Sequence, residues 1–180
     1  MHFCQYIYIL KHLIFLIIMS ELKITPKRKH YRDSKTGFSI QYPVLSRWNI
    51  KSKSPGKMIF VNKDTKATIV IGFIQLPNII PDLSDPSIFR LALNDIAGSY
   101  HKSHPNFEVL TSNMITNPNN GAKGVQIVYN DKISNHIWKG RLIAYFLENK
   151  RYDVTAFAEQ ESFDTMDNQF FTPVIKSFTF

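Results

Sequence analysis

The sequence has 180 residues, of which 44% are hydrophobic and 13% aromatic, so it can form one domain with a packed core without disulfides or metal. Its single cysteine, Cys4, excludes an internal disulfide. The net charge of +8 permits nucleic acid, anionic lipid or an acidic protein as a partner, and it selects none of them.

Residues 1–20 are strongly apolar, but Lys11 and His12 interrupt them. A bilayer span needs about 20 apolar residues, so this segment is short for an anchor. Residues 13–19 resemble the apolar part of a signal peptide, although no Ala-x-Ala cleavage site follows. A start at Met19 and a buried helix are two further interpretations. We predict a targeting or anchor segment, with a cytoplasmic protein that starts at Met19 as the alternative.

Basic residues follow this segment. Residues 21–30 are predicted to be a basic linker that leads into a domain over residues 31–180. A basic arm of this kind suits an acidic protein or a membrane surface, whereas the alternative is a solvated linker. By the positive-inside tendency an uncleaved anchor would keep the domain on the cytoplasmic side, which conflicts with simple export. The candidate partner-binding residues are Lys27, Arg28, Lys29, Arg32 and Lys35.

Two β-hairpins are predicted in the first half of the domain. Residues 30–32 and 38–42 flank a turn at 33–37, and residues 48–50 form a short continuation. Residues 58–62 and 67–76 form the second hairpin. The run 67–76 is almost entirely apolar and rich in β-branched residues, which places it in the interior of a sheet.

Two helices are predicted. The first begins near Asp85-Pro86, where an N-cap precedes a proline, and it should end before Pro105. A strand over residues 107–114 follows it. The second helix begins near Ser162, and Pro173 either kinks it or ends it.

Residues 121–159 are predicted to form three consecutive antiparallel strands. A two-residue turn at Asn149-Lys150 would place Glu148 opposite Arg151. Apolar side chains lie on both faces of this hairpin, so both faces must be covered. The two helices supply that cover, which predicts an α+β fold with helices on both faces of an antiparallel sheet. The residues expected to be buried are Leu142, Ala144, Phe146, Val154 and Ala156.

The sequence has no dinucleotide-binding, P-loop, nucleophile-elbow or zinc-protease motif, and we expect no cofactor. His101 and His104 fall one helical turn apart and are weak candidates for a metal site. The alternative is a pair of exposed histidines near the end of a helix. No aromatic–basic pattern typical of RNA-binding domains is present, so we expect no nucleic acid partner.

Three short motifs resemble the PsbP-like domains of the Mog1/PsbP superfamily. Phe38-Ser-Ile-Gln-Tyr-Pro43, followed by Trp48, resembles the Phe-x-x-x-Tyr-Pro…Trp opening of these domains. The strands that begin at Gly140-Arg-Leu-Ile-Ala-Tyr and Arg151-Tyr-Asp-Val-Thr-Ala are similar to their later hairpin. The closing Ile175-Lys-Ser-Phe178 is similar to their last helix. The resemblance covers residues 31–180 and implies the Mog1/PsbP-like α/β/α sandwich.

PsbP proteins are extrinsic subunits of photosystem II, Mog1 proteins bind the GTPase Ran, and other relatives are exported proteins or chaperones of secreted effectors. The resemblance therefore implies a non-catalytic binding or assembly module that acts through protein–protein contacts and is exported or membrane-associated. A cytosolic Mog1-like or chaperone-like protein is the alternative, and a metal-dependent enzyme that uses His101 and His104 is the second. No small-molecule substrate is identified.

Overall fold

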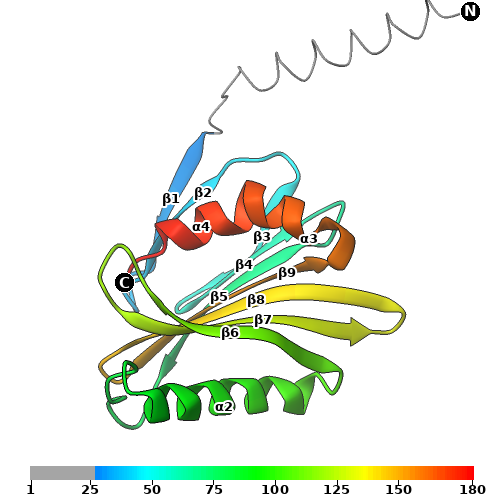
Figure 1. The fold of residues 1–180 in the computed structure, drawn as a ribbon. Helices are drawn as coiled ribbons and strands as arrows, with labels where there is room; N and C mark the ends of the chain where they lie inside the picture. Colours follow the sequence, from blue (N-terminus) through cyan, green and yellow to red (C-terminus); the bar gives the residue numbers. More distant parts are fainter. Residues whose placement is uncertain (1–26) are drawn as a thin grey trace, which may run out of the picture.

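The computed structural model describes residues 27–180, apart from the side chains of Ser52 and Lys53 (Figure 1). Seven strands form one antiparallel sheet in the order β3-β4-β5-β9-β8-β7-β6, and β1 and β2 pair with each other as a separate hairpin. The strands are β1 Arg28–Arg32, β2 Ser39–Pro43, β3 Trp48–Ser54, β4 Lys57–Asn62, β5 Thr68–Gln75, β6 Phe107–Thr116, β7 Lys123–Ile133, β8 His136–Leu147 and β9 Lys150–Glu159.

The helices lie on opposite faces of the sheet (Figure 1). Helix α2, Pro86–Ser103, packs beneath β6 and β7, and α4, Thr172–Ser177, lies on the other face against β2. Asp85 caps α2 as predicted, because its carboxylate accepts a hydrogen bond of 2.8 Å from the amide of Ser87. The predicted fold of an antiparallel sheet between two helical layers is confirmed.

Two hydrophobic cores occupy the two faces, and alternate residues of β8 belong to one core or the other. The larger core lies between the sheet, the β1–β2 hairpin and α4, and the smaller core lies between the sheet and α2. Of the residues predicted to be buried, Leu142, Ala144, Val154 and Ala156 are buried, whereas Phe146 is only half-buried. Strand β5 lies between β4 and β9, so its predicted place in the sheet interior is confirmed.

The turn between β8 and β9 corrects one prediction. Leu147 pairs with Lys150, so the two turn residues are Glu148 and Asn149 rather than Asn149 and Lys150. Glu148, not Asn149, takes the positive φ of 55°. Every predicted pair is consequently shifted by two residues, and a shift of two leaves each side chain on its predicted face.

The structure corrects one further prediction, for the segment at Trp48, and decides between the two alternatives for Pro173. The segment that starts at Trp48 does not continue β2 but forms β3, which pairs with β4. The C-terminal helix runs through Pro173 without ending: α3, Gln160–Met166, passes through a π-helical segment, η1 Asp167–Phe171, into α4. The wider π turn accommodates a proline, which has no amide hydrogen to donate.

Candidate functional site

The β1–β2 hairpin is attached to the end of α4 by polar contacts. The hydroxyl of Ser177 lies 2.8 Å from both the amide nitrogen and the carbonyl oxygen of Gln41. Ser39 exchanges two backbone hydrogen bonds of 2.7 and 3.0 Å with Thr179, beyond the helix. These bonds fix the angle between hairpin and helix, and a depression is left between them.

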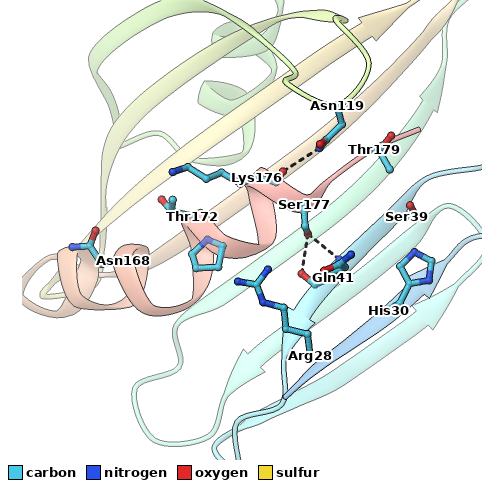
Figure 2. Close-up of a pocket in the computed structure, with 11 residues that line it drawn as sticks. Arg28, His30, Ser39, Gln41, Asn119, Asn168, Thr172, Lys176, Ser177 and Thr179 are labelled. Atoms are coloured by element: carbon cyan, nitrogen blue, oxygen red, sulfur yellow. Dashed lines mark hydrogen bonds between the residues drawn. The ribbon is translucent and has the colours of Figure 1, made fainter. Parts of the chain in front are cut away.

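This depression, which we call the hairpin–helix pocket, has a volume of about 760 Å³ (Figure 2). Hydroxyl, amide and basic side chains form most of its wall, and among residues 27–180 no carboxylate lines it. One wall comes from the start of the domain and the other from its end. The lining residues are Arg28, His30, Ser39, Gln41, Asn119, Asn168, Thr172, Pro173, Lys176, Ser177 and Thr179.

The basic side chains of the pocket come from two elements far apart in the sequence. Arg28 and His30 lie two residues apart on β1 and therefore share one face of that strand. Figure 2 shows Arg28 rising from β1 toward α4, and Lys176 on α4 with its side chain extending away from Arg28. Within residues 27–180, neither Arg28 nor Lys176 forms an ion pair. Their charges are therefore available to an external anion.

The five basic residues predicted to bind a partner do not form one cluster. Only Arg28 lines the hairpin–helix pocket. Lys29 is opposite Tyr42 and lies on the other face of the hairpin, and Lys35 lines one end of the sheet groove described below, beside Gly56. Lys27 directly precedes β1, and Arg32 ends it. The sequence pattern missed Lys176 and His30, since nothing local links residue 30 to residue 176.

The two candidate metal ligands lie at the end of α2. His101 is exposed, and His104 is the C-cap residue, with its ring 5.6 Å from the ring of Tyr100. The Nδ1 atom of His104 is 2.9 Å from the hydroxyl of Ser103. No cluster of three potential metal-binding side chains occurs in the described part of the chain. The structure therefore gives these two histidines no third ligand there.

A second hollow, the sheet groove, runs beside α2 over β5 and β9. Val70 and Thr155 form its floor, and the Tyr100 hydroxyl lies 2.8 Å from the Thr155 hydroxyl. Burial raises the pKa of Tyr100, so its hydroxyl remains protonated at neutral pH and does not act as a base. Burial also raises the pKa of Asp153, although Arg151, 3.0 Å away, opposes that rise.

No family model and no curated protein matches the sequence, whereas solved structures do. Cyanobacterial PsbP (CyanoP) from Synechocystis sp. PCC 6803 aligns with 88% of this chain and 95% of its own, at 15% identity and a TM-score of 0.61. The domain has the Mog1/PsbP-like fold. The fold that the motifs around Phe38 and Gly140 implied is thus confirmed.

Two further structures align with this PsbP-like domain. LpqN, involved in cell envelope biogenesis of Mycobacterium tuberculosis, aligns over 85% of this chain and 90% of its own, at 12% identity and a TM-score of 0.57. A Bacteroides thetaiotaomicron protein aligns over 87% of this chain but 48% of its own, at 13% identity and a TM-score of 0.52. Identities this low establish the fold and not the function.

No helix within residues 27–180 combines the length and hydrophobicity needed to cross a bilayer. The predicted targeting segment, residues 1–20, and most of the predicted linker lie outside the described residues.

Proposed function

We propose that this domain is a non-catalytic binding module that holds an acidic segment of a partner protein in the hairpin–helix pocket. The observation that carries the proposal is the composition of the pocket wall. Arg28, His30 and Lys176 all line the pocket, and no carboxylate of the described residues does. Guanidinium and ammonium groups without internal partners favour an anionic ligand, and the surrounding hydroxyls and amides can bond its backbone.

The size and openness of the pocket favour a chain segment over a small metabolite. Its walls are the exposed faces of a hairpin and a helix, and they carry few apolar side chains. Small-molecule sites are usually lined mainly by apolar groups. The PsbP-like fold supports a binding or assembly role by analogy only, because one fold serves many functions.

The test uses a fluorescein-labelled oligoglutamate peptide and fluorescence anisotropy. Arg28→Glu and Lys176→Glu should each weaken binding by about tenfold, since each reverses a charge that faces the ligand. Lys102→Glu is the matched control: it makes the same change of net charge at an exposed site on α2. Equal weakening by all three variants would mean that only net charge matters, which would contradict the pocket.

Anionic vesicles provide the comparison with a lipid partner. If phosphatidylglycerol vesicles bind in an Arg28-dependent manner and the peptide does not bind, the ligand is a membrane surface. The proposal of an acidic protein partner would then be wrong.

We further propose that the module works outside the cytoplasm or at a membrane. LpqN, which shares the fold, is involved in cell envelope biogenesis, and residues 1–20 have the composition of a targeting segment. Mass spectrometry of the endogenous protein tests this. An intact Met1 in the membrane fraction indicates an anchor, and an exported form that starts beyond Met19 indicates cleavage. A cytosolic form that starts at Met19 would overturn the proposal in favour of a Mog1-like or chaperone-like protein.

A further inference from the structure

Strand β6 is an open edge of the seven-stranded sheet. It has 10 residues, it is the last strand in the order, and among the described strands it pairs only with β7 (Figure 1). Residues 108–114 are all exposed. A strand in this position presents a row of backbone N–H and C=O groups that can pair with a further strand.

The opposite edge of the sheet shows what a protected edge looks like in this fold. Strand β3 carries the exposed lysine Lys51, and a bulge between Ile50 and Ser52 interrupts its register near the middle. Lysines and bulges on edge strands discourage pairing with other chains. Protection of this kind is therefore present on one edge.

Strand β6 has little of that protection. It contains no lysine, arginine or proline, and Glu108 at its start is its one charged residue. Its bulge, between Val109 and Thr111, also lies near the start, so residues 111–116 keep a regular register with β7. Val109, Leu110 and Met114 are each between 41% and 44% exposed, which is unusual for an edge that meets only water.

The pattern of β6 is complementary to itself. If two copies pair antiparallel with Ser112 on the two-fold axis, Thr111 of each copy lies opposite Asn113 of the other, and Leu110, the residue within the bulge, comes near Met114 of the other. Ser112 and Met114 pair with Ile127 and Val125 of β7, whose side chains belong to the core under α2, so both face α2. The alignment brings no like charges together, since Glu108, the one charged residue of β6, lies at the far end of the strand from the axis.

We infer that a second copy of this chain adds its β6 to this edge and forms a two-fold dimer whose sheet continues through both copies. A symmetric contact of this type uses the same patch on each partner, which a self-complementary strand provides. A foreign strand is a poorer occupant, since the edge carries no charge pattern that would select one.

Sedimentation velocity of the full chain over a range of concentrations tests the inference. The wild type should form dimers. Ser112→Lys places two ammonium groups opposite each other on the axis and should weaken dimerisation by at least about tenfold, since like charges directly opposite are destabilising. Ser54→Lys adds the same charge at an exposed site on the β3 edge and should leave the dimer intact. Circular dichroism verifies that both variants fold.

Disulfide trapping provides an independent readout of the register. In a Cys4→Ser background, Ser112→Cys should form an intermolecular disulfide under mild oxidation, and Ser54→Cys should not. A chain that remains monomeric at all concentrations overturns the inference. So does an association that Ser112→Lys leaves unchanged, because another surface or the N-terminal segment would then hold the copies together.

Discussion

A tyrosine on the neighbouring strand leaves no room for a side chain at Gly140. A Cβ atom at this position would lie 2.3 Å from Cζ of Tyr129. Tyr129 cannot move aside easily, since it is buried and its ring centre is 4.9 Å from that of Phe107. We predict that Gly140→Ala lowers the free energy of unfolding by about 1–3 kcal/mol, the usual cost of overpacking.

Gly72→Ala is the control for this prediction in urea denaturation. Gly72 also lies inside a strand, and a Cβ atom there would meet nothing within 4 Å. It should leave stability unchanged or raise it slightly, because alanine restricts the unfolded chain. Equal destabilisation by both changes would show that loss of strand glycines, and not contact with Tyr129, is the cause.

Asp33 organises the turn of the first hairpin. Burial alone would raise its pKa, but hydrogen bonds from the hydroxyl and amide of Thr36, the amide of Gly56 and the hydroxyl of Tyr31 outweigh burial and lower the pKa to about 2. Because the folded pKa lies below the unfolded value of 3.8, the stabilisation is present above pH 4 and is lost as the pH falls toward 2.

We predict that Asp33→Asn removes about 2 kcal/mol of stability at pH 6, which corresponds to the shift in pKa. The variant should also lose less stability than the wild type between pH 5 and pH 2.5. Urea denaturation at the three pH values provides the measurement. Parallel pH profiles for the two proteins would show that Asp33 does not carry this pH dependence.

The residues of the candidate site were the least predictable part of the molecule. Arg28 was identified because basic residues cluster visibly in the sequence. Its partners in the pocket are Lys176 and Ser177, which the chain brings near only through the attachment of Gln41 to the end of α4. A contact between residues this far apart leaves no periodic signal, so local patterns cannot predict it.

The π-helical segment between α3 and α4 is attached to the sheet by an ion pair. The guanidinium of Arg141 on β8 bonds the carboxylate of Asp167 and lies 2.7 Å from the hydroxyl of Thr172. Both charged side chains are about four-fifths buried, and Nε of Arg141 has no hydrogen-bond partner among the described residues. Loss of the carboxylate would leave a largely buried cation without compensation.

We predict that Asp167→Ala lowers the free energy of unfolding by about 2 kcal/mol, because an uncompensated buried charge is costly. Asp64→Ala breaks the exposed pair between Arg47 and Asp64 and should cost less than about 1 kcal/mol. Thermal and urea denaturation of the two variants would measure the contrast. Similar small losses would indicate that Arg141 reorients toward water when Asp167 is absent.

Periodicity located the elements better than it located their ends. The apolar stripe of α2 and the alternation of β8 and β9 arise from burial along whole segments. Both patterns therefore identify the element even when its first and last residues are predicted wrongly. The turn at residues 148–149 depends on single φ angles, and there the pairing of the whole hairpin placed Glu148, rather than the more tolerant Asn149, at positive φ. The prediction that residues 48–50 continue the first hairpin is wrong for a similar reason. A short polar strand has no long hydrophobic pattern, so its position in the sheet depends on the strand it pairs with.

Two cores share one sheet, and this arrangement predicts how the whole domain unfolds. Leu142 belongs to the core under α2, and its neighbour Ile143 belongs to the core under α4. The two tryptophans report on opposite faces: Trp48 stacks on Phe170 at 3.7 Å on the α4 side, whereas Trp138 lies 5.9 Å from Phe157 in the sheet groove. Variants that retain one tryptophan therefore follow one face each.

We predict that Leu142→Ala shifts the urea transition of both tryptophan probes equally and costs about 2–5 kcal/mol, as for other buried leucines. The physical reason is that the α4-side core cannot remain assembled once β8 and β9 separate, because its side chains alternate along the same backbone as those of the α2-side core. The experiment measures fluorescence in Trp138→Phe and Trp48→Phe backgrounds, with and without Leu142→Ala. If only the Trp138 transition moves, the α2 layer detaches on its own, and the two faces are separate folding units joined by a persistent sheet.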